Sequence, residues 1–350
     1  MRVVVVGATG NVGTSVLRSL AGADEVESIV GVARRLPSLR APKTEWRRAD
    51  VVSDDLAPVF DGADAVVHLA WAIQPSRDEA QLHAINVDGS RRVFDAAARA
   101  GVPALVYASS VGAYSPGPKD RRVDEGWPTG GVETSFYSRH KAAVERILDG
   151  FERDNPDTRV VRLRPGLIFK RDAATEIRRY FAGAFVPGAL VRPALIPIVP
   201  AVDRLRFQAV HSLDVGDAYA LAVTRDVRGA FNIAAEPVLD PDELGRILGA
   251  RPVRVPAKVL RIAADATWRL RLQPTPPGWV DMALAVPLLD TTRAREELGW
   301  RPRRSSADAL LELLGGMRDA AGADTPPLSP ATSGPLRVRE VLTGVGRENP

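Results

Sequence analysis

Short apolar runs alternate with segments of helical spacing through the first half of the chain. The runs rich in Val and Ile lie at 3–6, 29–33, 65–69, 104–108 and 160–163, and apolar residues recur every three or four positions in 12–20, 85–100 and 137–151. Continuous apolar runs are typical of strands in a parallel sheet that helices cover on both faces. The alternation therefore predicts an α/β fold with a doubly wound parallel sheet of the Rossmann type.

The pattern becomes irregular and rich in proline after Arg164. Residues 207–223 and 230–234 regain helix and strand spacing, so we expect 206–235 to return to the first domain. The prediction is a Rossmann domain over 1–164, rejoined by 206–235, and a smaller, mostly helical substrate-binding region built from 165–205 and 236–319. From Ala320 on, prolines and serines without a periodic apolar face predict a flexible tail over 320–350.

Composition narrows the class of protein. The chain of 350 residues has 47 basic and 43 acidic residues, interspersed along its length, so no basic stripe for nucleic acid is expected. It has no cysteine, which excludes disulfides, thiolate metal ligands and a cysteine nucleophile. The four histidines show no metal-ligand spacing, and we expect no metal site.

Neither the N-terminus nor the most apolar later stretch predicts a membrane segment. Met1 and Arg2 lead directly into the first strand, without the apolar core of a signal peptide. The most apolar later stretch, 185–202, is interrupted by prolines and cannot form one spanning helix. We therefore expect a cytoplasmic protein with no membrane partner.

A glycine-rich string, GATGNVG, follows the first predicted strand and precedes a predicted helix. Glycines allow a tight turn and a close approach of a pyrophosphate to the backbone, and the helix N-terminus favours an anion. Placement between strand and helix is the context that a dinucleotide site requires. The residues expected to bind the cofactor here are Gly7, Thr9, Gly10, Asn11, Val12 and Gly13.

The end of the second predicted strand bears on which dinucleotide binds. NAD sites usually place an acidic residue there for the ribose hydroxyls, whereas this chain has Ala33 followed by Arg34. A guanidinium can hold a 2′-phosphate through two hydrogen bonds. The cofactor is therefore expected to be NAD(P), with NADP favoured over NAD. Asp50 and Val51, after the next strand-like stretch, are the expected adenine contacts.

Tyr137 and Lys141 lie four residues apart in YSRHK, which places both on one face of a helix. A phenol is a poor base at neutral pH, and a nearby ammonium favours its ionised form. Ser110 follows the strand-like run 104–108, and ligands of doubly wound sheets lie at the carboxyl ends of strands. We expect Ser110, Tyr137 and Lys141 to form a catalytic group.

Several strings together resemble the NAD-dependent epimerase/dehydratase family, the extended short-chain dehydrogenases/reductases. They are GATGNVG, HLAW at 68–71, NVDG at 86–89, YSRHK at 137–141, LRPG at 163–166, VHSLDVGDAYA at 210–220, FNIA at 231–234 and LDTTRAREELGWRP at 289–302. The resemblance implies that Ser110 orients the reacting oxygen, that Tyr137 exchanges its proton, and that Lys141 lowers the tyrosine pKa and holds the nicotinamide ribose.

The same resemblance assigns further residues to the cofactor and implies an oligomer. Leu69, Ala70 and Trp71 would line the cofactor, Asn86 would steady the central helix, and Pro165 and Gly166 would border the nicotinamide. Trp71 stands where the family commonly has a small residue. A homodimer is implied, paired through helices at 85–100 and 137–151.

Departures from the family pattern bear on the substrate. Val111 and Gly112 stand where dehydratases carry an acidic pair, and Leu167 stands where many nucleotide-sugar enzymes have Asn. Four cations could receive a substrate phosphate, Lys170, Arg171, Arg178 and Arg179, or four apolar residues could form a lid over a less polar substrate, Phe181, Phe185, Leu190 and Leu195.

Three functions remain open. The first is an oxidoreductase that transfers hydride at a secondary alcohol or ketone carbon of a small-molecule alcohol, ketone or sugar-like substrate. The second is a nucleotide-sugar epimerase with retained cofactor. The third, of another class, is a non-catalytic NADP-sensing regulatory protein, against which the Ser110, Tyr137 and Lys141 set argues.

Overall fold

One seven-stranded parallel sheet organises the first domain. The computed structural model describes residues 1–74, 76–181 and 196–333. The strand order is β11-β7-β5-β4-β1-β2-β3. The strands are β1 (Arg2–Val6), β2 (Ser28–Ala33), β3 (Thr44–Arg48), β4 (Ala65–His68), β5 (Ala104–Ala108), β7 (Arg159–Pro165) and β11 (Gly229–Ile233). The predicted doubly wound α/β fold is confirmed.

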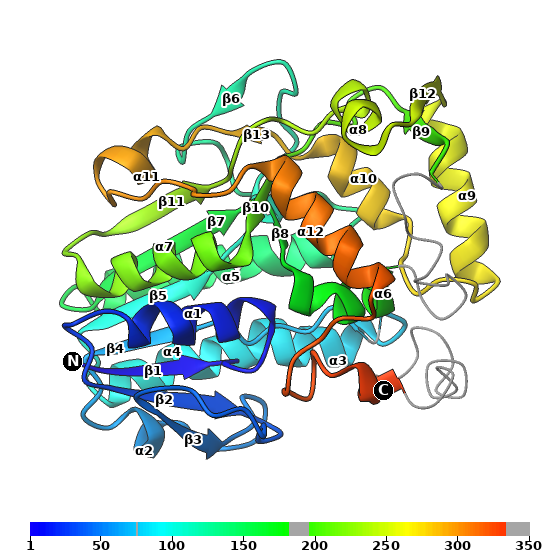
Figure 1. The fold of residues 1–350 in the computed structure, drawn as a ribbon. Coiled ribbons are helices and arrows are strands. Elements are labelled where there is room, and N and C mark those ends of the chain that lie inside the picture. Colours follow the sequence, from blue (N-terminus) through cyan, green and yellow to red (C-terminus); the bar gives the residue numbers. More distant parts are fainter. Residues whose placement is uncertain (75, 182–195, 334–350) are drawn as a thin grey trace.

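Helices cover both faces of the sheet because its strands are apolar on both sides. Val3 and Val5 pack toward α1 (Asn11–Ala21) and α7 (Ser212–Thr224), and Val4 and Val6 pack toward the opposite layer. That layer contains α2 (Ala57–Phe60), α3 (Glu79–His83), the π-helical turn Ala84–Asp88, α4 (Gly89–Arg99) and α5 (Phe136–Asp154). Figure 1 shows α1 and α7 side by side over one face.

A second region lies beyond the carboxyl ends of the strands (Figure 1). It contains α6 (Ala174–Phe181), α8 (Pro241–Leu248), α9 (Ala257–Arg269), α10 (Gly278–Ala285) and α12 (Ser306–Arg318), whereas α11 (Thr292–Glu296) packs against the start of β11. Three two-stranded parallel sheets join this region to the body: β8 (Leu167–Phe169) with β10 (Ala209–His211), β9 (Ile198–Ala201) with β12 (Arg251–Arg254), and β6 (Arg122–Val123) with β13 (Leu288–Leu289). Of the segment 206–235, α7 and β11 belong to the first domain, whereas β10 pairs with β8.

The segment after α12 does not match the predicted flexible tail. Leu328 is fully buried, and the Thr325 hydroxyl donates to the Thr9 carbonyl oxygen at 2.8 Å. Backbone N–H groups of Thr175 and Ala323 also bond within this packing, to Ala321 and Leu328. The expectation of a flexible tail from Ala320 is therefore wrong for 321–333, because a few apolar and hydroxyl side chains dock without helical spacing; residues 334–350 lie outside the described part.

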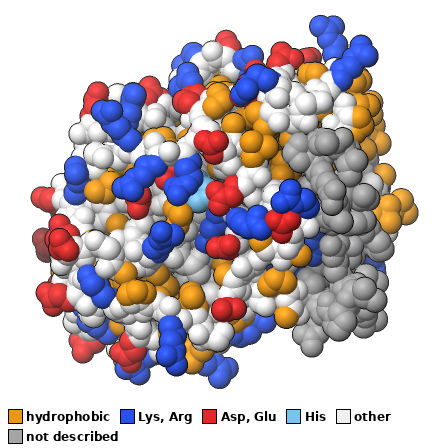
Figure 2. All heavy atoms as spheres, in the orientation of Figure 1, with side chains coloured by type: hydrophobic (Ala, Val, Ile, Leu, Met, Phe, Trp, Pro, Cys, Tyr) orange, Lys and Arg blue, Asp and Glu red, His pale blue; other side chains and the backbone are white. Residues whose placement is uncertain are grey.

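Charge is mixed on the surface, as the sequence predicted. Figure 2 shows basic and acidic side chains intermingled on the face drawn. No described helix is long and apolar enough to cross a membrane. Within 1–74, 76–181 and 196–333, no group of three His, Asp or Glu side chains is placed to hold a metal ion.

Candidate active site

The turn between β1 and α1 fits closely against the loop after β4. Gly7 has φ +87°, and a Cβ there would lie 2.6 Å from the Ala70 nitrogen. A Cβ at Gly13 would lie 2.5 Å from the Gly7 carbonyl oxygen, so both positions require glycine. A Cβ at Gly10, by contrast, would meet only the Gly7 oxygen, at 3.8 Å. Gly10 caps α1 without a side-chain bond, which leaves an open, electropositive helix end suited to a pyrophosphate.

A cavity opens from this turn along the carboxyl ends of the strands. Eight of the predicted cofactor residues line it: Gly7, Thr9, Gly10, Arg34, Val51, Leu69, Ala70 and Trp71. Other residues that were not predicted to contact the cofactor also line the cavity, among them Arg35, Ala49, Ala72, Ile85, Glu176, Arg179, Tyr180, Pro326 and Pro327. The last six come from the π-helical turn, α6 and the segment after α12, and no local motif assigns them to a cofactor. Arg179 was expected only as a candidate for a substrate phosphate.

Some predicted cofactor residues point elsewhere. The Asp50 carboxylate accepts from the Val52 N–H at 2.9 Å and is not among the residues that line the cavity, and its contact with adenine stays a prediction. Asn11 donates to the Ile168 carbonyl oxygen at 3.3 Å, and Val12 packs against the core. Asn11, Val12 and Gly13 thus shape the turn from behind rather than line the cavity.

Asn86 holds the loop after β4 in place. Its buried side chain accepts from the Ala72 N–H at 2.7 Å and donates to the Ala72 carbonyl oxygen at 2.8 Å. Asn86 lies in the π-helical turn, so it braces the cavity wall rather than the central helix alone. Pro165 and Gly166 lie at the carboxyl end of β7, and the Gly166 N–H donates to Ile233 at 3.0 Å. Neither of these two lines the cavity.

Ser110 and Tyr137 meet beyond the end of β5. The Ser110 hydroxyl accepts from the Gly112 N–H at 3.0 Å, and Tyr137 lies in the first turn of α5, which Ser135 caps. Burial raises the pKa of Tyr137, and a hydrogen bond with Ser110 opposes the rise. The phenol is therefore neutral at physiological pH in the chain alone.

Lys141 lies one turn further along α5 and is 3% exposed. Its ammonium donates to the Ala108 carbonyl oxygen at 2.5 Å and lies 3.4 Å from the centre of the Trp71 ring. It is 5.9 Å from the centre of the Tyr137 ring. Burial lowers the pKa of Lys141, and the Glu145 carboxylate opposes this. The ammonium thus belongs to the site but is directed at Trp71 and the backbone.

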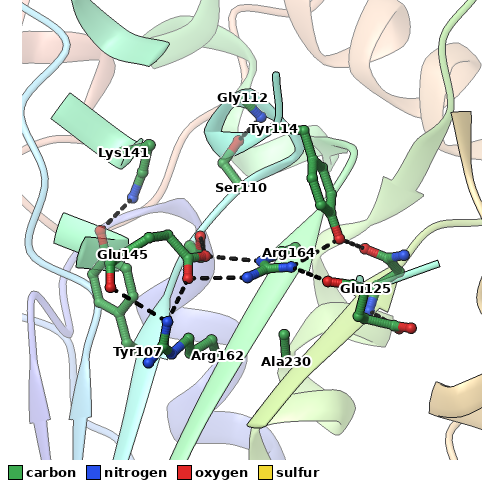
Figure 3. A network of polar contacts seen from close by, with 12 residues as sticks. Tyr107, Ser110, Gly112, Tyr114, Glu125, Lys141, Glu145, Arg162, Arg164 and Ala230 are labelled. Carbon is green, nitrogen blue, oxygen red and sulfur yellow. Dashed lines mark hydrogen bonds and ion pairs between the residues drawn. The ribbon is translucent and has the colours of Figure 1, made fainter. Parts of the chain in front are cut away.

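Beneath these residues lies a buried charge network centred on Glu145 (Figure 3). Glu145 is fully buried and accepts from Arg164 Nε at 2.8 Å, Arg164 Nη2 at 3.0 Å and Arg162 Nη1 at 2.9 Å. The Ser109 hydroxyl donates to it at 2.5 Å. Arg164 also donates to the Tyr114 hydroxyl at 3.0 Å. The network ties α5 to the ends of β5 and β7, and so fixes where Ser110 and Lys141 lie.

Aromatic and thioether side chains enclose the Tyr137 ring. Trp279 of α10 lies with its ring centre 4.9 Å from that of Tyr137, and Trp71 with its centre at 5.8 Å. A Cβ at Gly112 would lie 2.9 Å from the Tyr137 ring and 3.1 Å from Met282 Sδ. Trp279 and Met282 come from a distant part of the sequence and were not predicted. They make the surroundings of the Tyr137 ring apolar.

The four cations after β7 do not form one phosphate-binding group. Lys170 is buried and donates to the Asn11 carbonyl oxygen at 2.7 Å, and Arg171 pairs with Asp319 at 2.6 Å. Arg178 is buried in α6, and only Arg179 lines the cavity. Of the predicted apolar lid, Phe181 packs edge-on against Trp279, with ring centres 4.9 Å apart, while Phe185, Leu190 and Leu195 lie outside the described residues.

Residues 3–234 match the NAD dependent epimerase/dehydratase family. The chain belongs to this family. An uncharacterized protein of Mycobacterium tuberculosis is 28% identical over 334 residues, which span 88% of this chain and 82% of the relative. The decarboxylating sterol-4-alpha-carboxylate 3-dehydrogenase of Saccharomyces cerevisiae is 28% identical over 200 residues, 56% of this chain and 52% of that protein.

Solved structures of the family share the fold. The UDP-glucose 4-epimerase of Thermotoga maritima, with UDP-glucose, superposes with a TM-score of 0.67 at 20% identity, over 91% of this chain and 99% of that one. The dTDP-glucose 4,6-dehydratase of Streptomyces venezuelae, with NAD, superposes with a TM-score of 0.65 at 19% identity, over 91% and 97%. The likeness establishes the Rossmann-type architecture for this family member.

Proposed function

We propose that this family member is an NAD(P)-dependent oxidoreductase that interconverts a secondary alcohol and a ketone. The observation that carries the proposal is the meeting of Ser110, Tyr137 and Lys141 at the carboxyl end of β5, next to the cavity that starts at the glycine turn. The residues present fit a dinucleotide, since the glycine turn leaves the space at Gly10 and an uncapped helix end for its phosphates.

A bound nicotinamide supplies or accepts the hydride. In the reducing direction, the neutral Tyr137 phenol donates its proton to the carbonyl oxygen, and the Ser110 hydroxyl orients that oxygen by a second hydrogen bond. In the oxidising direction, the phenolate of Tyr137 removes the hydroxyl proton as hydride leaves the same carbon. Lys141, as a buried cation on the same helix, stabilises that phenolate once it is released from Trp71.

The chemistry around Tyr137 supports a weakly polar substrate. Trp279, Met282 and Phe181 present aromatic and thioether surface, and Leu167 replaces the Asn of many nucleotide-sugar enzymes. The yeast relative is named as a dehydrogenase of a sterol 3-position, a secondary alcohol in an apolar frame. The proposed substrate class is therefore a secondary alcohol or ketone on an apolar, ring-containing skeleton rather than a nucleotide sugar.

The proposal favours NADP over NAD. Arg34 and Arg35 are exposed at the end of β2, line the cavity, and stand where an acidic residue would select the NAD ribose. The family name and the bound cofactor of the dehydratase structure refer to NAD, so the preference rests on these two side chains alone. Weaker binding of NADP than of NAD in a direct titration would reverse this part.

The test is a change in absorbance at the reduced nicotinamide band with purified protein and a panel of cyclic secondary alcohols and ketones. Turnover that Tyr137→Phe abolishes supports the proposal. An epimerase would instead retain its cofactor through purification and interconvert stereoisomers without net reduction, and a sensor would bind NADP without turnover.

We also expect a homodimer that pairs α4 and α5, which light scattering would test.

A further inference from the structure

Arg179 is a buried cation with unused hydrogen-bonding capacity at the cofactor cavity. The residue is 5% exposed and lies on α6, among the residues that line the cavity. Its Nε and Nη1 are buried and have no hydrogen-bond partner among the described residues. Buried N–H donors are almost always satisfied, and leaving them unpaired is unfavourable, the more so for a charged group. These donors therefore indicate an acceptor that arrives from outside the chain.

The third nitrogen of the guanidinium fixes its position. Nη2 donates to the Pro327 carbonyl oxygen at 2.7 Å, and Pro327 belongs to the segment 321–333. The same segment is tied to the glycine turn by the Thr325 hydroxyl, which donates to Thr9 at 2.8 Å. One short chain thus links Arg179 to the turn where the phosphates of a dinucleotide would lie. Figure 1 shows this segment, in red, passing beside α6.

The charge of Arg179 is only partly balanced. Glu176, one turn earlier on α6, also lines the cavity, and burial raises its pKa to about 7 although Arg179 opposes the rise. The Tyr180 hydroxyl interacts with both side chains. A carboxyl group with a raised pKa offsets a guanidinium less than an ordinary carboxylate does, and a phosphate would neutralise the remaining positive charge.

We propose that Arg179 is a phosphate-binding residue for the dinucleotide, presented by α6 and held in place by the segment 321–333. The guanidinium would turn its unpaired donors toward phosphate oxygens across the cavity from Gly10 when the dinucleotide enters. The acceptor is a pyrophosphate common to NAD and NADP, whereas exposed Arg34 addresses the 2′-phosphate of NADP alone. The inference rests on the proposed dinucleotide site. It adds a phosphate-binding side chain on the side of the cavity opposite the glycine motif.

Calorimetric titration of the full chain with ADP and with adenosine tests the assignment. Arg179→Met should weaken ADP, NAD and NADP alike by about tenfold to a hundredfold, the usual loss for a charge-assisted hydrogen bond, and leave adenosine within about twofold. The matched control Arg34→Ala should weaken NADP and leave ADP unchanged. ADP binding by Arg179→Met that equals the wild type overturns the assignment, whereas failure of the wild-type chain to bind ADP overturns the dinucleotide site itself.

A structural role alone would give a different pattern. Because Met leaves no unpaired buried donors, a folded Arg179→Met chain without ligand should melt within a few degrees of the wild type. Should that variant fail to fold, hydrogen exchange on the wild-type chain decides. ADP, but not adenosine, should slow amide exchange in 174–181 and 321–333, and no change with ADP would overturn the proposal.

Discussion

The Lys141 ammonium lies 3.4 Å from the centre of the Trp71 ring, in the loop after β4. Cation–π contacts of a desolvated ammonium contribute about 0.5–2 kcal/mol. The Trp71 Nε1 is buried and has no partner among the described residues, so the indole is held here by its face rather than by a hydrogen bond. Approach of a nicotinamide ribose to Lys141 therefore requires that the indole ring leave the ammonium.

Trp71→Ala should tighten binding of the complete dinucleotide. The variant removes the contact that binding has to break, and about 0.5–2 kcal/mol corresponds to roughly twofold to thirtyfold in Kd. ADP lacks the nicotinamide ribose, and its affinity should not change. Parallel titrations with NADP and ADP measure the two affinities. Trp279→Ala is the control, because Trp279 also contacts Tyr137 but lies on the proposed substrate side. Weaker NADP binding by Trp71→Ala would show that the indole packs on the cofactor instead.

Tyr137→Phe should lower turnover by about two to four orders of magnitude while leaving dinucleotide affinity near the wild-type value. The phenol pKa is raised by burial, against the opposing hydrogen bond with Ser110, so the neutral form predominates at neutral pH. Ketone reduction, which uses the neutral phenol, should fall as pH rises through that raised pKa, and alcohol oxidation should rise. Steady-state rates in both directions across pH check the two opposite slopes; parallel slopes would exclude Tyr137 as the proton carrier.

Glu145→Gln should destabilise the fold by roughly 3–5 kcal/mol, because it leaves two buried guanidinium groups without their shared anion. Asp149→Asn is the matched control, since Asp149 pairs with Arg162 from a side chain that is 57% exposed. Its effect should stay below about 1 kcal/mol. Urea unfolding at neutral pH measures the free energy of unfolding of both variants. Equal losses would mean that the burial of Glu145 does not add to stability.

The stabilisation from Glu145 should also depend on pH. Burial raises its pKa, but the hydrogen bonds and charges of Arg164 and Arg162 outweigh this and hold the pKa at about 2, below the ordinary 4.5. A lowered pKa in the folded chain means that the stabilisation is complete above about pH 4.5 and is lost as pH falls toward 2. The difference in unfolding free energy between wild type and Glu145→Gln should therefore narrow over this range.

Leu328→Ala should destabilise the chain by about 2–5 kcal/mol, as expected for a fully buried leucine. The exposed Leu311 of α12 provides the control, and Leu311→Ala should cost less than about 1 kcal/mol. Truncation after Ala320 should likewise lower the melting temperature and weaken ADP binding, since it removes the partner of Arg179. An unchanged melting temperature after both changes would mean that the segment 321–333 does not dock in solution.

The parts that the sequence predicted depend on short spacings. Val3 to Val6 and the glycine turn are contiguous, and Tyr137 and Lys141 are one helical turn apart, so periodicity alone placed them. The strand β3 was not predicted with defined bounds, because it is an edge strand with Glu45 and Arg47 exposed and has no apolar run.

The missed residues depend on long-range packing. Trp279 contacts Tyr137, and Pro327 contacts Arg179, across more than a hundred positions of sequence, and no local pattern predicts either contact. Asp50 shows a local alternative to ligand contact. A carboxylate that follows a strand can accept from the backbone two residues on as well as from a ligand, and here it accepts from Val52.

The apolar cluster between the large sheet and the layer of α1 and α7 is completed by residues from far along the chain. Val3, Val5 and Val16 are buried in one cluster with Val215 and Tyr219 of α7, and Phe231 of β11 and Trp300 belong to the same cluster. A nascent chain that has emerged from the ribosome only as far as residue 164 would still expose that apolar face to solvent. Because α7 and β11 are translated after the whole of 165–205, the domain that comes first in sequence cannot finish folding first during synthesis.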